Sequence, residues 1–228
     1  MEQSTAHPVC LSIIGGTGAL GGALARRALR HNIQVCIGSR FADRAASLAN
    51  ELRAQIPGAR VSGKTNIEAA IDGDMVVVTV PFARQIATLQ QIKAVVPGKI
   101  LIDTTVPLVP PKVARVQLPE EDSAAVRAQR ELGESVRVVS ALHTVSAAKL
   151  GSLADASTLG DVLVFGEDKA SRQSVVSLLQ AIDLRALHGG PLANSAAAEA
   201  MTSVLIFLNK AYGAAEAGLR ISGLPPHV

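Results

Sequence analysis

The feature that most constrains the fold is a cluster of glycines near the start of this 228-residue chain. An apolar stretch at residues 9–14 leads directly into the sequence GGTGALGG at residues 15–22, and residues 19–31 then carry apolar side chains at helical spacing. Within the cluster, Gly16, Gly18 and Gly21 have the spacing GxGxxG. A strand, a glycine turn and a helix in this order predict the first unit of a parallel α/β sheet.

Each of the three glycines has a physical role in such a unit. The first permits a tight turn, the second lets a pyrophosphate approach the backbone, and the third lets the helix pack closely on the strand. The free amides at the start of the helix then donate to the phosphates. We therefore expect a dinucleotide site formed by Gly16, Thr17, Gly18, Ala19, Leu20 and Gly21. A purely structural glycine turn is the alternative.

The end of the second predicted strand indicates which dinucleotide is bound. An NAD site places Asp or Glu about 20 residues after the glycines, to hold the ribose 2′-hydroxyl. Here residues 33–38 are followed by Ser39 and Arg40, and Arg44 lies one helical turn further on. A hydroxyl and two guanidinium groups suit a 2′-phosphate, because arginine pairs with phosphate through forked donors. The sequence favours NADP over NAD, with solvated surface arginines as the alternative.

The remainder of the chain alternates short apolar runs with segments of helical periodicity, a pattern typical of a parallel sheet covered on both faces. The predicted strands are residues 9–14, 33–38, 74–80, 99–104, 136–141, 162–166 and 183–187. The predicted helices between them are residues 19–31, 42–55, 83–95, 123–133 and 168–181. The expected class is α/β, a doubly wound Rossmann-type parallel sheet with a small, mainly helical C-terminal extension.

Two further segments complete the predicted architecture. Four prolines interrupt residues 105–122, which predicts a loop at the carboxyl end of a strand, either lining the site or forming an ordinary surface excursion. From Asn194 onward, apolar residues recur every three or four positions as far as Leu219, which predicts one long helix that is apolar on more than one face. We expect an NADP-binding unit at residues 1–188, a helical segment at 189–228 that completes the acceptor site, and a homodimer formed through that helix.

Composition argues against several other classes of protein. The chain has no Trp and one Tyr, whereas proteins that bind RNA or single strands use stacking aromatic side chains, so no nucleic-acid partner is expected. The longest apolar run, residues 204–208, is far below the roughly 20 residues of a membrane span. Cys10 and Cys36 lie inside predicted strands, and the N-terminus is unlike a secretory signal, which favours buried thiols in the cytoplasm. No spacing of metal ligands stands out, and no metal site is expected.

With these motifs identified, the sequence resembles the NADPH-dependent oxidoreductases that act on the deazaflavin coenzyme F420. The resemblance extends over nearly the whole chain, and its more specific parts are VVSALHT at residues 138–144 and GPLANS at residues 190–195. It implies reversible hydride transfer between C4 of NADPH and C5 of the deazaflavin. Matching positions imply NADP contacts at Thr17, Ser39, Arg40 and Arg44, and a nicotinamide contact at Pro81.

The resemblance also places His143, Thr144 and Val145 around the deazaflavin ring. A hydride arriving at C5 is accompanied by a proton at N1, so His143 is a candidate proton donor or polar anchor. A histidine held only by packing at a strand end is the alternative. The sequence departs from the family at Phe82, where an indole is more familiar, and at Pro110-Pro111. Two other functions stay open, an NADPH-dependent reductase of a flavin, metal chelate or imine, and a non-catalytic NADP-sensing protein.

Overall fold

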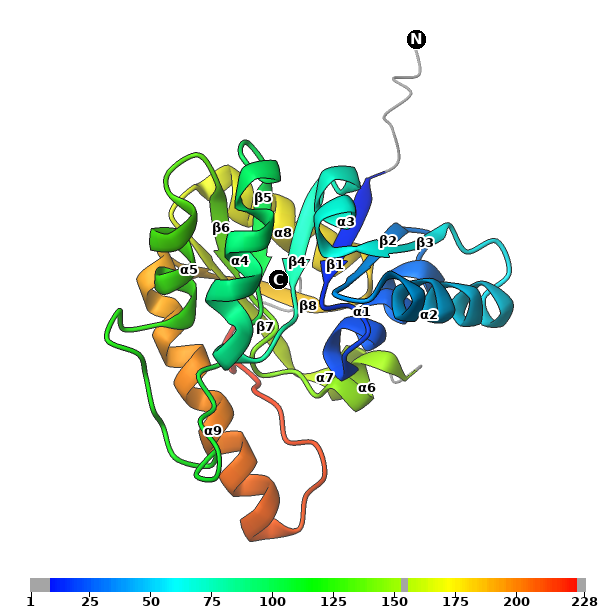
Figure 1. The fold of residues 1–228 in the computed structure, drawn as a ribbon. Helices are drawn as coiled ribbons and strands as arrows, with labels where there is room; N and C mark the ends of the chain where they lie inside the picture. The colour runs from blue at the N-terminus through cyan, green and yellow to red at the C-terminus, as the bar shows by residue number, and fades with distance from the viewer. Residues whose placement is uncertain (1–8, 153–155, 225–228) are drawn as a thin grey trace, which may run out of the picture.

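A computed structural model describes residues 9–152 and 156–224 of the chain, and the N-terminal segment that was compared with a secretory signal lies outside these residues. One eight-stranded sheet runs through the described part, with helices on both of its faces (Figure 1). The strands are β1 (Cys10–Ile14), β2 (Gln34–Ser39), β3 (Val61–Thr65), β4 (Met75–Val78), β5 (Ile100–Asp103), β6 (Arg137–Ser140), β7 (Asp161–Gly166) and β8 (Arg185–Gly190). Their order is β3-β2-β1-β4-β5-β6-β7-β8.

The helices connect these strands and cover the sheet. The α-helices are α1 (Ala19–Arg30), α2 (Ala42–Gln55), α3 (Asn66–Asp72), α4 (Gln85–Ile92), α5 (Ala124–Leu132), α6 (Ala147–Gly151), α7 (Ala156–Leu159), α8 (Lys169–Ala181) and α9 (Ser195–Tyr212). Short 3₁₀ turns are η1 (Phe82–Arg84), η2 (Lys93–Val95) and η3 (Leu192–Asn194). Within the described ranges, none of the helices combines the length and hydropathy of a transmembrane span.

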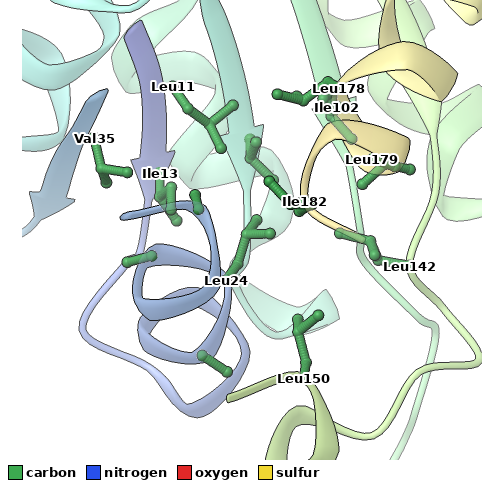
Figure 2. Packing of buried hydrophobic residues seen from close by; sticks show 14 of the residues in the cluster. Leu11, Ile13, Leu24, Val35, Ile102, Leu142, Leu150, Leu178, Leu179 and Ile182 are labelled. Atoms are coloured by element: carbon green, nitrogen blue, oxygen red, sulfur yellow. The ribbon is translucent and has the colours of Figure 1, made fainter. Parts of the chain in front are cut away.

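The first six strands confirm the doubly wound prediction. They are all parallel and lie in the order 3-2-1-4-5-6, which is the order of a Rossmann-type sheet. Alternate side chains of β1 enter two separate cores. Leu11 and Ile13 pack with Leu24 of α1 and with Ile182, which follows α8 (Figure 2), whereas Ile14 packs on the opposite face. Cys10 and Cys36 are free, buried thiols, as predicted.

The last two strands depart from the expected all-parallel sheet. β7 runs antiparallel to β6 and pairs with it only at Val139↔Gly166 and Ser140↔Phe165, and β8 is parallel to β7. A parallel return would require a helix that crosses the sheet face beside β6. The connecting helix α6 instead packs against α1, with Leu150 in the core around Leu24. The chain therefore enters β7 from the carboxyl edge of β6.

Four elements were missed by the sequence prediction, namely β3, α3, α6 and α7. The first two lie at the end of the sheet formed by β2 and β3. β3 has the sequence VSGKT and is an edge strand whose residues after Val61 are only partly buried, so it lacks an apolar run. α3 is only seven residues long, which is too short to show periodicity. Its capping box, in which Thr65 and Glu68 each bind the other's backbone amide, was the signal available in the sequence.

The C-terminal helix is shorter than predicted. It ends at Tyr212 because Gly213 adopts φ +63°, a left-handed conformation that closes a helix. The residues after it return to the sheet (Figure 1). There the amide of Asp161 donates to the Leu219 carbonyl at 2.6 Å, and the buried Asp161 carboxylate accepts from the Ile221 amide and pairs with Arg185. α9 and this returning tail together form a wall beyond the end of β6.

Candidate functional site

The glycine loop is held so that the first amides of α1 face a cleft. Gly15 has φ +73°, and the Gly16 and Gly18 amides donate to the Gly38 and Gly15 carbonyls at 2.9 and 3.0 Å. Gly18 is the N-cap of α1, and it provides no side chain to bind the helix amides. The first turn contains no acidic residue either. The amides at the start of the helix therefore remain available to an anionic ligand.

The three motif glycines meet different neighbours. A Cβ on Gly21 would lie 2.6 Å from both the Gly16 Cα and the Thr79 Oγ1, so the helix touches the loop and the residue that follows β4 at this point. A Cβ on Gly16 would lie 2.7 Å from the Ile13 carbonyl oxygen. A Cβ on Gly18 would meet the Gly15 carbonyl oxygen at 3.3 Å and the Thr79 carbonyl oxygen at 4.0 Å, because Gly18 borders the open cleft. Two of the glycines thus permit close packing, and the third leaves space for a ligand.

The cleft has a volume of about 260 Å³ and lies at the carboxyl ends of β1, β2 and β4. It brings together six of the residues predicted to bind NADP, namely Thr17, Gly18, Ser39, Arg40, Arg44 and Pro81. The other predicted loop residues do not line it. Ala19 faces an adjoining groove beside α6, and Leu20 packs partly against the core. Gly16 and Gly21 pack against each other and do not line the cleft.

At the β2 side of the cleft, two arginines flank an aromatic ring. The guanidinium carbons of Arg40 and Arg44 lie 5.8 and 4.9 Å from the ring centroid of Phe41. The Phe41 amide donates to the hydroxyl of Ser39 at 3.2 Å, which fixes that hydroxyl at the strand end. Asp43, the one acidic residue in the first turn of α2, does not line the cleft. This wall presents positive charge where a bare 2′-hydroxyl would need a carboxylate.

Several residues of the cleft were not predicted from sequence. Asn66 accepts the Gly15 amide through its side-chain oxygen at 3.3 Å, and Thr79 donates to the Ile14 carbonyl at 3.0 Å. Arg84 adds a third guanidinium to the lining, from η1. Asn66 was missed because it follows β3, the strand that was itself missed. Thr79 and Arg84 follow β4, and the rule that strand ends share one edge was the signal that pointed to them.

His143, Thr144 and Val145 line a second pocket, of about 210 Å³, which they share with α9 and the returning tail. The pocket follows β6, whose carboxyl end lies at the same edge as the glycine loop because β1, β4, β5 and β6 are parallel. The His143 ring nitrogen Nε2 is 2.9 Å from the Ser140 hydroxyl, and Thr202 of α9 donates to the His143 carbonyl at 3.0 Å.

Burial controls the charge of His143. The side chain is only 6% exposed, and desolvation lowers the pKa of its imidazole from 6.5 to about 4. The ring is therefore neutral at physiological pH. A neutral imidazole with one nitrogen on Ser140 can orient a ligand by a hydrogen bond at its other nitrogen. Of the two roles expected from the sequence, polar anchor and proton donor, the neutral state favours the anchor.

The motif at residues 190–195 begins at the end of β8 and leads into α9. Leu192 is buried in the core formed with α4 and α5, and its amide donates to the Glu167 carboxylate at 3.0 Å. It does not line the pocket of His143. The end of β8 lies two strands from the end of β6, because Gly190 pairs with Phe165 and Phe165 pairs with Ser140. The C-terminal segment instead reaches the pocket through Thr202, Leu205 and Asn209 of α9.

The fold and the cleft define a dinucleotide-binding protein of the Rossmann class, and the similarity to known proteins specifies the family. A family model described as NADP oxidoreductase, coenzyme F420-dependent, matches residues 11–107. The F420-dependent NADP reductase of Methanocaldococcus jannaschii is 37% identical over 222 residues, covering 94% of this chain and 98% of the relative. That of Methanothermobacter marburgensis is 35% identical over 223 residues, covering 94% and 99%. The chain belongs to the F420-dependent NADP reductase family.

Solved structures agree on the fold. A proposed F420-dependent NADP reductase from Arthrobacter sp. FB24 superposes with a TM-score of 0.78 at 24% identity, covering 95% of this chain and 99% of that one. An imine reductase from Bacillus cereus gives a TM-score of 0.65 at 16% identity, covering 90% of this chain and 62% of that one. At such low identities these similarities bear on the fold alone. Among the described residues, no group of three or more His, Cys, Asp or Glu side chains could hold a metal ion.

The adjacent glycines at the start of α1 allow a matched test of the close contact. Gly21→Ala would place a methyl group 2.6 Å from the Gly16 backbone and should weaken NADPH binding at least about tenfold by displacing the loop. Gly22→Ala meets nothing closer than 3.7 Å and should leave binding unchanged, while raising helix stability by about 0.5–1 kcal/mol. Calorimetric titration and thermal unfolding measure both effects. Equal NADPH affinity in the two variants would contradict the close contact between Gly21 and Gly16.

The state of His143 can be measured directly. A histidine whose pKa is about 4 in the folded protein and 6.5 when unperturbed binds fewer protons when folded, so its contribution to stability is present above pH 6.5 and is lost as pH falls toward 4. We expect the His143 resonances in NMR to titrate near pH 4. The free energy of unfolding should decrease as the pH is lowered from 6.5 toward 4. A titration midpoint near 6.5 would show that the ring is not desolvated.

Proposed function

We propose that this protein catalyses reversible hydride transfer between NADPH and coenzyme F420. In the reduction of F420, NADPH gives a hydride from C4 to C5 of the deazaflavin, a proton reaches N1, and NADP⁺ is released. No covalent bond to the protein is needed. The role of the chain is to hold two ligands in contact and to exclude water, which lowers the barrier by orienting the reacting atoms.

One observation carries the proposal: the two pockets lie at one edge of the sheet, and each has the chemistry of one partner. The first offers the amides of α1 to a pyrophosphate and the Arg40 and Arg44 guanidinium groups to a 2′-phosphate. The second combines a neutral histidine with the aliphatic side chains of Val145, Leu205 and Ile206. Such a mixture suits a flat, largely apolar ring that is held by few hydrogen bonds.

The roles of individual residues follow from this arrangement. The loop from Gly16 to Gly21 forms the pyrophosphate site, with Gly18 and the first amides of α1 facing the ligand and the other residues shaping the turn. Ser39, Arg40 and Arg44 hold the 2′-phosphate together with Thr17. Pro81 borders the nicotinamide at the end of β4. His143, Thr144 and Val145 hold the deazaflavin, with the neutral imidazole as a hydrogen-bonding anchor. Residues 1–188 form the NADP-binding unit, and 189–228 complete the acceptor site through α9.

The decisive experiment is the reduction of F420 by NADPH. The purified protein should bleach oxidised F420, and stereospecifically labelled NADPH should deliver only one of its two C4 hydrogens. His143→Ala should lower turnover while leaving the affinity for NADPH nearly unchanged. Brisk NADPH oxidation with a flavin, a metal chelate or an imine, but none with F420, would identify another acceptor. NADPH binding without turnover of any of these would indicate a sensing protein.

We also propose a cytoplasmic homodimer that associates through α9. Several large apolar side chains are exposed on α9 and on the loop at residues 105–122 that runs beside it (Figure 1). They are Val204, Phe207 and Tyr212 on the helix and Val109, Val116 and Leu118 on the loop. Apolar groups gathered on neighbouring segments favour a protein contact. Light scattering that gives the mass of one chain at micromolar concentration would reject the dimer.

The preference for NADPH over NADH tests the proposed contact between Arg40 and the 2′-phosphate. Arg40→Ala removes a charge-assisted contact to the 2′-phosphate worth about 1.5–3 kcal/mol. NADPH affinity should therefore fall roughly ten- to hundredfold, with little change for NADH, which lacks that phosphate. Arg60→Ala, an exposed arginine outside the cleft, is the matched control and should change neither. Dissociation constants for both nucleotides decide the outcome, and equal weakening of NADPH and NADH would make Arg40 a structural residue.

A further inference from the structure

A buried carboxylate joins α9 to α5 outside both pockets. Glu199, on the second turn of α9, is only 1% exposed. Its two oxygens accept the amides of Ala124 and Ala125 at 2.7 and 3.2 Å. These are the first two amides of α5, which have no partner inside their own helix. A side chain 75 positions away in the sequence therefore caps α5.

The cap is shared with two serines. Ser123 is the N-cap of α5, and its hydroxyl accepts the Val126 amide at 3.0 Å. The first residue of α9, Ser195, places its hydroxyl 2.9 Å from the Ser123 hydroxyl and 3.2 Å from the Glu199 carboxylate. The first turns of α5 and α9 are thus tied through one fully buried polar cluster. Such contacts depend on direction and distance, so they fix how far α9 can slide or rotate.

The same cluster reaches the end of β5. The Gln85 side chain donates to the buried Asp103 carboxylate at 2.6 Å and to the Ala124 carbonyl at 2.8 Å. Burial raises the pKa of Glu199 to about 7, and the nearby Asp103 adds to this effect, whereas the two amides oppose it. Keeping a carboxylate here is costly, and a local neutral cap would have sufficed for α5 alone.

The residues that follow Glu199 along α9 reach the second pocket. Thr202, three positions on, donates to the His143 carbonyl at 3.0 Å. Leu205 and Asn209 are one and two turns further and line the same pocket, and Asn209 accepts the Ala217 amide of the returning tail at 2.8 Å. Positions three or four apart share one face of a helix. A contact that fixes α9 at Glu199 therefore also fixes where Thr202, Leu205 and Asn209 lie.

We propose that Glu199 is the positioning residue of the acceptor half of the site: by capping α5 it fixes the register of α9, and through Thr202 it fixes the place of His143. This inference rests on the proposed function, because the acceptor pocket is the one that α9 walls. The hydrogen-bond partners of Glu199 are Ala124, Ala125 and Ser195, none of which lines the NADP cleft, so its loss should act on the acceptor alone.

The test compares two variants that each remove a carboxylate from a helix N-terminus. Glu199→Gln keeps the shape of the side chain but replaces one accepting oxygen by the NH₂ group of an amide, which cannot accept a hydrogen bond from a backbone amide. Asp168→Ala removes the cap of α8, where Asp168 accepts the Ser171 amide at 2.7 Å and does not line the acceptor pocket. Both variants should lower the melting temperature. Only Glu199→Gln should raise the dissociation constant for F420, by about tenfold, with NADPH within about twofold of the parent.

A second readout needs no acceptor. The NMR resonances of the His143 imidazole should shift in Glu199→Gln and in Thr202→Val, which removes the link to the His143 carbonyl, and should stay in place in Asp168→Ala. If Glu199→Gln does not fold, Ser195→Ala removes one donor to the same carboxylate and should give a smaller effect of the same kind. Equal effects on F420 and NADPH, or unchanged F420 binding and unchanged His143 resonances, would overturn the proposal. Failure of the parent protein to bind F420 would remove the proposed function, while the resonances would still decide the positioning.

Discussion

The contact on which the structure depends is the approach of α1 to the glycine loop. At Gly21 the helix comes so close to Gly16 and to the residue that follows β4 that a single methyl group would not fit. This contact aims the axis of α1 at the cleft, and it leaves the uncapped helix amides facing the space beyond Gly18. A positive electrostatic potential then exists before any side chain contributes, because it comes from the backbone itself. In the proposed assignment, the arginines at the end of β2 add selectivity for the 2′-phosphate to a site that the backbone has already formed.

The parts of the molecule that follow from local sequence were the ones predicted. The GxGxxG turn, the strand that ends at Ser39 and the arginines after it are encoded within a few residues of one another, and the parallel topology brings them together. Long-range features were not predicted. The reversal of β7 arises because α6 packs on α1, and α9 ends at Tyr212 through the left-handed Gly213 although the apolar spacing continues. The spacing of apolar residues indicates which positions can be buried, but it does not indicate where the backbone changes direction.

In the candidate site, too, features encoded by neighbouring residues were predictable and features that depend on distant segments were not. Ser39, Arg40 and Arg44 are close in sequence, so their shared wall was predictable from one strand end. Asn66 reaches the loop from a strand that sequence periodicity did not reveal, and Arg84 follows a different strand again. The neutral state of His143 was not predictable either, since it depends on burial beneath α9 and not on its neighbours in the chain.

The two halves of the site therefore respond differently to change. The NADP half is made by a backbone turn and by side chains from one strand end, which lie close together in the sequence. The proposed acceptor half is assembled from β6, α9 and the returning tail, and buried carboxylates of Glu199 and Asp161 bind backbone amides at α5 and in the tail. Buried polar groups lose their partners together when one is removed, and the lost free energy is that of an unsatisfied charge or dipole. If Glu199 positions α9 as proposed, specificity for the acceptor depends on residues that never touch it as well as on those that do. This is a physical reason why proteins sharing the NADP-binding sheet can differ in what they reduce.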